Sequence, residues 1–193
     1  MVIAAFDLVP YALPLTEPVT WGGTAYAERR GVLVRVEDAS GAVGWGDVAP
    51  LPGFSAESLG EARRALEALA AALVGRTLTP AEALPGGSVE AALDASGLPP
   101  SARFGIDLAL AEGAALELGR SLPQALHPDP AVLLPLNGLV MGTGPEAVAS
   151  ARRLAEAGYA AVKLKVGRQP VDDDLALVAA VREALPAHVA LRL

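Results

Sequence analysis

Hydrophobic positions over the first fifty residues follow a strand-like pattern. Residues 2–11 form one apolar run, residues 31–37 form a second that is rich in Val, and residues 43–48 form a third. The Asp-Ala-Ser-Gly stretch at 38–41 has the composition of a turn, which predicts a hairpin between the second and third strands. Residues 13–28 are rich in Pro, Gly and Thr and are predicted to form a long loop, which in a compact domain is usually functional or mobile.

The hydrophobic period then becomes helical. Ser55 is a candidate N-cap for a helix that ends at Gly75 and has its apolar positions at Leu59, Leu66, Leu69 and Leu73. Residues 79–100 are rich in Pro and Gly and are predicted to be irregular. A second helix stops at Gly119 and places one apolar face at Phe104, Leu108, Ala111, Ala115 and Leu118.

From residue 131 onward, short apolar stretches alternate with helices. The sequence predicts strands at 132–137, 160–166 and 188–193, and helices at 145–157 and 171–185. This alternation is typical of βα units and a parallel sheet. The predicted fold class is therefore α/β plus α+β, with an α+β domain over residues 1–130 and a βαβαβ portion over residues 131–193. Because a closed α/β barrel needs more strands than these, the barrel is expected to be incomplete, with an open edge.

Composition narrows the class of protein. Hydrophobic residues make up 52% of the chain and charged residues 19%, so a sizeable core is available. The net charge is −7 and no basic run forms a stripe, which disfavours nucleic acid and anionic membranes as partners. The absence of cysteine excludes disulfides and thiolate metal sites and fits a cytoplasmic protein. No apolar run is long enough for a membrane span, and the first residues read as a strand rather than a signal peptide.

Two lysines carry the strongest chemical signal. Of the 15 Lys and Arg residues, only Lys163 and Lys165 are lysines, and they lie two positions apart on a predicted strand. Because strand side chains alternate, both point to one side while Val162 and Leu164 point to the other, toward the covering helices. An inward, partly desolvated Lys can act as a general base, whereas Arg cannot give up its proton. The alternative is an amphipathic surface strand with two solvated lysines.

Arg192 lies on the last predicted strand, and its side chain is expected to face inward with the lysines. A buried Arg needs an anionic partner, such as a substrate carboxylate or a structural acid. The alternative is that Arg192 lies in a frayed chain end.

The remaining candidates are weaker. His127 lies in a linker and His188 precedes a strand. The Asp run at 172–174 opens a helix, where acids favour the helix dipole, and no metal is expected there.

Two segments resemble a known family. Gly44-Trp-Gly-Asp47 and the following Pro50-Leu-Pro-Gly-Phe-Ser55 look like the capping-domain loop of o-succinylbenzoate synthases in the enolase superfamily, and Lys163-Leu-Lys165 matches the family's Lys-x-Lys motif. Residues 100–112 and 134–138 resemble the family's next helix and its first barrel strand. Dipeptide epimerases and muconate lactonizing enzymes share Lys-x-Lys, but its combination with the Pro-rich loop is more specific. The resemblance covers essentially the whole chain.

The resemblance implies a fold, a reaction and a set of site residues. An α+β capping domain closes over the mouth of a modified (β/α) barrel, and cap loops at 13–24 and 51–55 screen the substrate from water. The implied reaction is the dehydration of 2-succinyl-6-hydroxy-2,4-cyclohexadiene-1-carboxylate to o-succinylbenzoate in menaquinone synthesis. Lys165 would be the base and then the acid, with Lys163 beside it, and Mg²⁺ would stabilise the enediolate. The expected substrate-binding residues are Arg192, Asn137, Trp21, Gly53 and Phe54.

The metal ligands of this family are expected after Leu193. The family continues the third strand into an Asp-Ala-Asn segment and supplies a Glu, another Asp and an opposing Lys from later strands. None of these lies within the 193 residues, so this polypeptide by itself is expected to lack a metal site and useful activity.

Two alternatives stay open. An N-acylamino acid racemase or dipeptide epimerase of the same superfamily uses the same Lys-x-Lys motif with a second Lys across the barrel. The chain can also be a non-catalytic domain that binds a partner through the open edge of its sheet. The expected partner is otherwise a small dicarboxylate substrate, and a homo-oligomer is left open.

Overall fold

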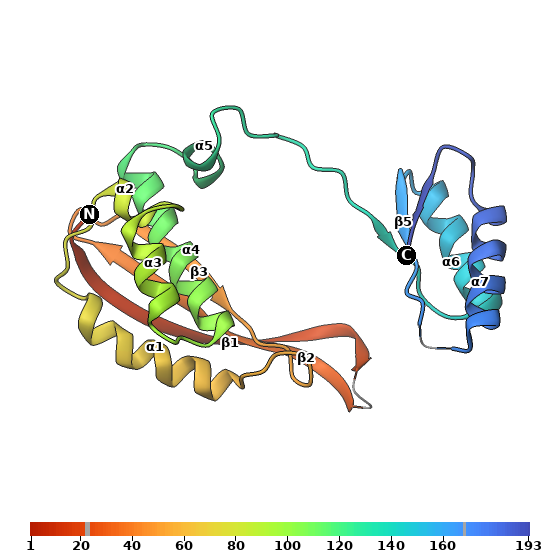
Figure 1. Ribbon diagram of the computed structural model, residues 1–193, viewed down its shortest axis with the longest axis horizontal. Helices are drawn as coiled ribbons and strands as arrows, with labels where there is room; N and C mark the ends of the chain where they lie inside the picture. The colour runs from red at the N-terminus through yellow and green to blue at the C-terminus, as the bar shows by residue number, and fades with distance from the viewer. Residues whose placement is uncertain (22–23, 168) are drawn as a thin grey trace. The chain divides into compact units, whose positions relative to one another are not determined.

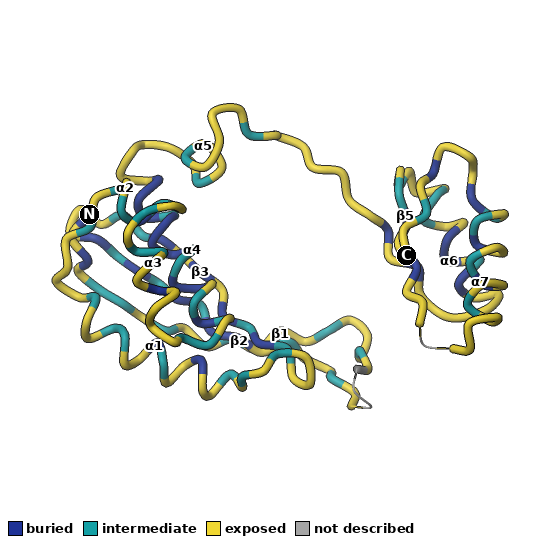
Figure 2. Tube along the Cα trace, in the orientation of Figure 1, coloured by how far each residue is buried: buried dark blue, intermediate teal, exposed yellow. Residues whose placement is uncertain are grey.

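The computed structural model describes residues 1–21, 24–167 and 169–193, and the side chain of Trp21 lies outside the described part. The chain divides into two compact units, Met1–Pro130 and Ala131–Leu193 (Figure 1). Each unit has its own cluster of buried apolar residues, and Figure 2 shows the buried positions gathered on the inward faces of the helices and strands of each unit.

An antiparallel sheet in the order β1-β2-β3 forms the first unit: β1 (Ile3–Trp21), β2 (Thr24–Asp38) and β3 (Val43–Val48). The predicted hairpin at 31–48 is confirmed. Val32, Val34 and Val36 are buried on one face of β2 and pair with β3 in register. Asp38 is only 6% exposed and closes the turn by accepting hydrogen bonds from Ser40 and from the backbone N–H of Ala42.

The predicted long loop at 13–28 is wrong. Over residues 13–21 and 24–28, β1 and β2 pair as a hairpin arm, with one register shift between Pro14 and Val19. Pro14 and Pro18 made the segment read as a loop. They lie on β1, which is an edge strand, so the N–H groups that these prolines lack need not all enter a ladder.

Helices of the first unit begin with α1 (Leu59–Leu73), whose predicted apolar face and stop at Gly75 are confirmed by the packing of Leu66, Leu69 and Leu73. The predicted N-cap at Ser55 is wrong. Ser58 is the N-cap, and it forms a reciprocal capping box with Glu61.

Two short helices, α2 (Pro80–Ala83) and α3 (Ser88–Ala95), occupy most of the segment that was predicted to be irregular. Thr79 and Glu82 form a capping box, and Pro80 occupies the first turn of α2, where it is tolerated. The last helices of this unit are α4 (Pro100–Glu117) and α5 (Leu122–Leu126).

Helix α4 packs across β3 and β2 and buries Ala111 and Ala115 of the predicted apolar face, but not its two ends. Phe104 and Leu118 are 59% and 46% exposed. The sheet comes so close that a Cβ at Gly44 would lie 2.0 Å from the carbonyl oxygen of Ala109, and one at Gly46 would lie 1.8 Å from that of Gly105. The buried residues of α4 are mainly small: Ala102, Gly105, Ile106, Ala109, Leu110, Ala111, Gly113, Ala114 and Ala115.

The second unit is a βαβαβ array with β4 (Gly138–Leu139), α6 (Gly144–Glu156), β5 (Ala161–Lys163), α7 (Val171–Ala184) and β6 (Ala190–Arg192). Its strands are parallel in the order β4-β5-β6, as the alternation predicted. The predicted helices at 145–157 and 171–185 are confirmed. Val162 and Leu164 are buried in the apolar cluster formed with these helices.

The predicted strand at 132–137 is wrong, and the two other strands are shorter than predicted. β4 pairs with β5 only at Gly138 and Leu139, because β5 begins at Ala161 and offers no partner further back. Residues 132–136 are therefore extended and solvated, with Val132 96% exposed. Within the described residues, no helix is both long and apolar enough to cross a membrane.

Candidate functional site

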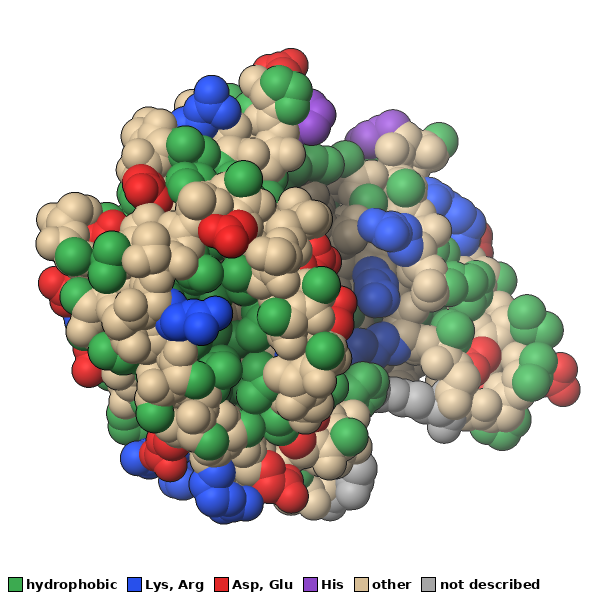
Figure 3. Space-filling model, turned by 60° about the vertical axis from the view of Figure 1, so that its left-hand side comes forward, with side chains coloured by type: hydrophobic (Ala, Val, Ile, Leu, Met, Phe, Trp, Pro, Cys, Tyr) green, Lys and Arg blue, Asp and Glu red, His purple; other side chains and the backbone are tan. Residues whose placement is uncertain are grey.

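Lys163 and Lys165 lie on one face of the parallel sheet, opposite the buried Val162 and Leu164. The alternation predicted from the sequence therefore holds through the end of β5. Both lysine side chains are exposed. Lys163 sits in register between Leu139 of β4 and Arg192 of β6. In Figure 3, Lys and Arg side chains of this unit lie close together on one surface.

Arg192 and Asn137 meet on the same sheet although they are far apart in sequence. The guanidinium Nη1 of Arg192 donates to Oδ1 of Asn137 over 3.4 Å. The backbone N–H of Leu164 donates to the carbonyl oxygen of Arg192 over 2.9 Å, so pairing of β5 with β6 continues beyond Lys163. The structure thus brings together four of the predicted site residues: Lys163, Lys165, Arg192 and Asn137.

Metal ligands do not gather near these residues. Within residues 1–21, 24–167 and 169–193, no three His, Cys, Asp or Glu side chains form a group that could hold a metal ion. Asp174 instead accepts a hydrogen bond from the backbone N–H of Gly167 over 2.6 Å, which ties the start of α7 to the loop after β5. The described residues therefore do not fit a Mg²⁺ site.

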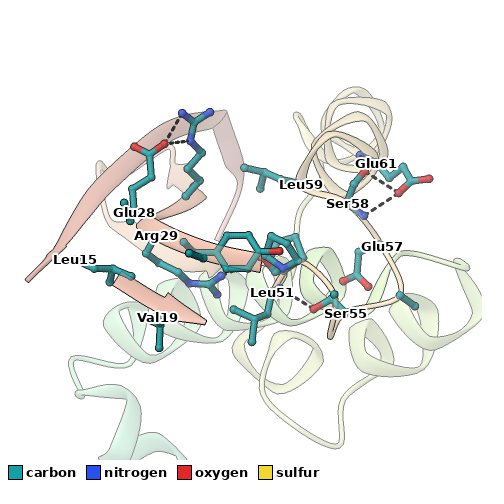
Figure 4. A pocket seen from close by; sticks show the side chains of 18 of the residues that line it. Leu15, Val19, Glu28, Arg29, Leu51, Ser55, Glu57, Ser58, Leu59 and Glu61 are labelled. Carbon is teal, nitrogen blue, oxygen red and sulfur yellow. Dashed lines mark hydrogen bonds and ion pairs between the residues drawn. The ribbon is translucent and has the colours of Figure 1, made fainter. Parts of the chain in front are cut away.

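A large cavity of about 910 Å³ lies in the first unit, between the hairpin arm and the loop before α1. The arm contributes Pro14, Leu15 and Val19, and the loop contributes Leu51 and Gly53. Figure 4 shows Leu15, Val19 and Leu51 on the same side of the cavity as Arg29, and Ser58 and Glu61 at the start of α1. The lining is mainly apolar with charged groups at its margin, which suits an organic ligand that carries charge.

The loop at 51–55 is folded on itself. The backbone N–H of Leu51 donates to the Ser55 hydroxyl over 2.8 Å, and the N–H of Ser55 donates back to the Leu51 carbonyl oxygen over 2.8 Å. Gly53 has a φ of +75°, a conformation that favours glycine. Phe54 is 84% exposed at the tip. Gly53 and Phe54 therefore belong to a formed turn, whereas the Trp21 side chain lies outside the described part.

Three residues near this loop were not singled out from the sequence: Tyr11, Arg29 and Asp47. The Tyr11 hydroxyl donates to Oδ1 of Asp47 over 2.8 Å. Burial, together with the hydrogen bond and the negative charge of Asp47, raises the pKa of Tyr11 to about 12. Arg29 donates to the carbonyl oxygens of Ala49 and Pro50. The strand register brings this cluster together, because it pairs Tyr11 with Gly31, Leu13 with Arg29, and Leu33 with Asp47.

Two family models match the chain. Residues 3–113 match the family described as MenC, N-terminal domain, and residues 146–193 match the one described as Enolase C-terminal domain-like. The first match lies in the unit that carries the cavity, and the second includes β5, α7 and β6.

Known relatives agree with these matches. The o-succinylbenzoate synthase of Thermosynechococcus vestitus is 33% identical over 183 residues, which are 95% of this chain and 49% of that protein. A substrate-liganded L-Ala-D/L-Glu epimerase from Bacillus subtilis is 27% identical with a TM-score of 0.86, covering 100% of this chain and 53% of that one. A dipeptide epimerase from Cytophaga hutchinsonii, complexed with Mg and D-Ala-L-Val, is 25% identical with a TM-score of 0.82 and covers 100% and 51%. The chain spans about half the length of the curated relatives it matches.

Proposed function

The chain belongs to the enolase superfamily, in the family that carries the MenC N-terminal domain, and from this premise we propose that the full-length protein is an o-succinylbenzoate synthase. The reaction is the dehydration of 2-succinyl-6-hydroxy-2,4-cyclohexadiene-1-carboxylate, a hydro-lyase step of menaquinone synthesis. The observation that carries the proposal is the common sheet face of the two lysines, Arg192 and Asn137.

Lys165 is the proposed base. Its amine takes the proton from the carbon next to the substrate carboxylate, and the resulting ammonium then gives that proton to the departing hydroxyl, so that water leaves. Lys163 adds positive charge beside the carboxylate. Arg192, whose fork can bind a carboxylate through two parallel hydrogen bonds, and Asn137 hold the substrate.

Mg²⁺ belongs to this proposal only for the full-length protein. The ion would stabilise negative charge on the substrate carboxylate, and we place its ligands C-terminal to Leu193. The cap supplies the other part of the site: the loop with Gly53 and Phe54, and Trp21 on the arm, are proposed to cover the substrate. A cysteine-free sequence fits the cytoplasm, where this small dicarboxylate would be the partner.

The test uses the full-length protein with Mg²⁺ and the cyclohexadiene substrate, followed by the ultraviolet absorbance of the diene. We expect dehydration by the unaltered protein. Lys165→Arg keeps the charge but cannot give up a proton, so kcat should fall by about 10³-fold, within the range of general acid–base catalysis. Lys163→Arg is the matched control, because it keeps the charge that is proposed to be its main contribution. A Lys165→Arg enzyme with kcat within a few-fold of the unaltered protein would contradict the assignment.

A dipeptide epimerase is the second candidate, favoured by the fold likeness to the epimerase of Bacillus subtilis over the whole chain. It would use the same lysine face to remove the proton next to a carboxylate, without loss of water. The same protein is therefore incubated with L-Ala-L-Glu and L-Ala-D-Glu. Interconversion of the two dipeptides with no dehydration of the cyclohexadiene would replace the synthase by the epimerase.

A further inference from the structure

Arg29 lies between the hairpin arm and the base of the 51–55 loop. It comes from β2 and is half-buried, whereas the next residue, Arg30, is exposed. The Arg29 side chain donates one hydrogen bond to the carbonyl oxygen of Pro50 over 3.1 Å and another to that of Ala49. It therefore binds two successive backbone carbonyl groups at the point where β3 ends and the loop starts.

The loop that Arg29 contacts forms hydrogen bonds within itself, and just beyond it Glu57 accepts a hydrogen bond from the backbone N–H of Ser101 in α4 over 2.8 Å. Its own hydrogen bonds join Leu51 to Ser55, and α1 starts just beyond at the Ser58 cap. These bonds hold the turn together, but they do not attach it to the sheet. Arg29 supplies that attachment from β2, on the same side of the cavity as Leu51, as Figure 4 shows.

Arg29 also separates two hollows. It lines the 910 Å³ cavity beside the arm and a second one of about 400 Å³ that reaches Asp47 and the start of α4. Asp47, which lines the second cavity, accepts a 2.8 Å hydrogen bond from the Tyr11 hydroxyl. Lys could replace Arg29 only in part, because one ammonium cannot present two parallel donors from a planar fork.

We propose that Arg29 is the positioning residue that fixes the loop 49–55, with Gly53 and Phe54, against the hairpin arm. It acts through the loop and touches no reacting atom. The inference rests on the proposed function for its effect on catalysis, but the fixing of the loop can be tested without any substrate. Loss of Arg29 should loosen the loop while the core of the first unit stays folded.

Limited chymotrypsin digestion of the chain, with fragments identified by mass spectrometry, tests this directly. Phe54 at the loop tip and Phe104 in α4 are 84% and 59% exposed, so the first reports on the loop and the second on the folded core. Arg29→Ala removes both hydrogen bonds from the charged guanidinium, so it should raise cleavage after Phe54 at least about tenfold and leave cleavage after Phe104 unchanged. Arg29→Lys should give an intermediate rate.

Arg30→Ala is the matched control, since it removes the same charge one residue away. Among the interactions of the described residues, it breaks the hydrogen bond and ion pair with Glu28. It should leave cleavage after Phe54 unchanged. The proposal is overturned if Arg29→Ala is cleaved there no faster than Arg30→Ala. It is also overturned if cleavage after Phe54 and Phe104 rises together, because Arg29 would then stabilise the whole unit.

In the full-length enzyme, Arg29→Ala should raise KM about tenfold and change kcat by less than about threefold, because a loosened cover weakens substrate binding without altering the proton transfer. Arg29→Lys should recover part of the loss. A fall in kcat at unchanged KM would overturn the assignment. If the protein turns over no cyclohexadiene, the proposed function fails, and the digestion still decides whether Arg29 fixes the loop.

Discussion

Gly46 tests how tightly α4 rests on the sheet. Replacing it by Ala adds one methyl group, whose carbon would lie 1.8 Å from the carbonyl oxygen of Gly105 and 2.7 Å from its carbonyl carbon. Both atoms belong to helix backbone, so no side chain can rotate away. Since ordinary contact begins near 3.4 Å, α4 must retreat from β3 by roughly 1.5 Å.

The size of the effect follows from that retreat. A gap of 0.5–1 Å already forfeits about a quarter to a half of each contact's dispersion energy. The small residues of α4 that face the sheet, such as Gly105 and Ala109, would lose contact together. We therefore expect the free energy of unfolding to fall by about 3 kcal/mol, at the upper end for overpacked cores. For a unit of this size, that corresponds to roughly 10 °C in Tm.

The assay is thermal and urea unfolding, followed by helical circular dichroism and by tryptophan fluorescence. Gly60→Ala is the control, because the nearest atom to its added Cβ would be a flexible Arg64 nitrogen at 3.5 Å. Gly60 lies in α1, where Ala is favoured over Gly, so this variant should be neutral or up to about 1 kcal/mol more stable. The reasoning is refuted if Gly46→Ala melts within about 1 °C of the unaltered chain, or if both variants lose equally.

Further predictions concern single polar groups of the first unit. Burial acts to raise the pKa of the Asp38 carboxyl, but hydrogen bonds from Ser40 and Ala42 outweigh it and hold the pKa below its usual value. The carboxylate therefore stabilises the fold above the unfolded pKa of about 3.9, and this stabilisation is lost as pH falls through the lower folded pKa. When the urea midpoint of unfolding is measured against pH, Asp38→Asn should reduce its fall over this acidic range. Asp47→Asn removes the negative charge and leaves a neutral amide oxygen as the acceptor, so it should lower the pKa of Tyr11 from about 12 toward its ordinary value in a tyrosinate absorbance titration. An unchanged titration would show that the charge of Asp47 does not contribute. Ser58→Ala should cost about 1 kcal/mol in urea unfolding while Ser58→Asp, also a good N-cap, restores it.

Local signals explain what the sequence predicted well. The strand at 43–48 and the helices at 145–157 and 171–185 each have their period, turn and cap within a few residues, and all three exist. The face of α4 could not be predicted in this way. Large apolar residues normally mark the buried face, but Gly44 and Gly46 let the helix backbone come so near the sheet that it is Gly105 and Ala109 that lie against them. The residues that decide which face of α4 is buried, Gly44 and Gly46, lie on β3 and not on α4.

The hairpin arm and the role of Arg29 could not be predicted from the sequence, for a related reason. Proline counts against a strand only where its missing N–H is needed, and that depends on whether the strand lies at an edge, which local sequence does not encode. Arg29 and Arg30 are identical in local sequence terms. Arg29 is half-buried and holds a loop, whereas Arg30 is exposed and pairs with Glu28. This difference arises because neighbouring side chains of a strand point to opposite faces, and because β3 ends beside Arg29.

The lysine pair shows how far alternation alone can lead. It placed Lys163 and Lys165 on the face away from Val162 and Leu164, and the structure agrees. Their meeting with Arg192 and Asn137 needed the parallel order β4-β5-β6 as well, since Asn137 and Arg192 are 55 residues apart. Both lysines are exposed in the described chain, whereas a lysine acts best as a base when it is partly desolvated. The proposed role of Lys165 therefore requires that this face be screened from water when substrate binds.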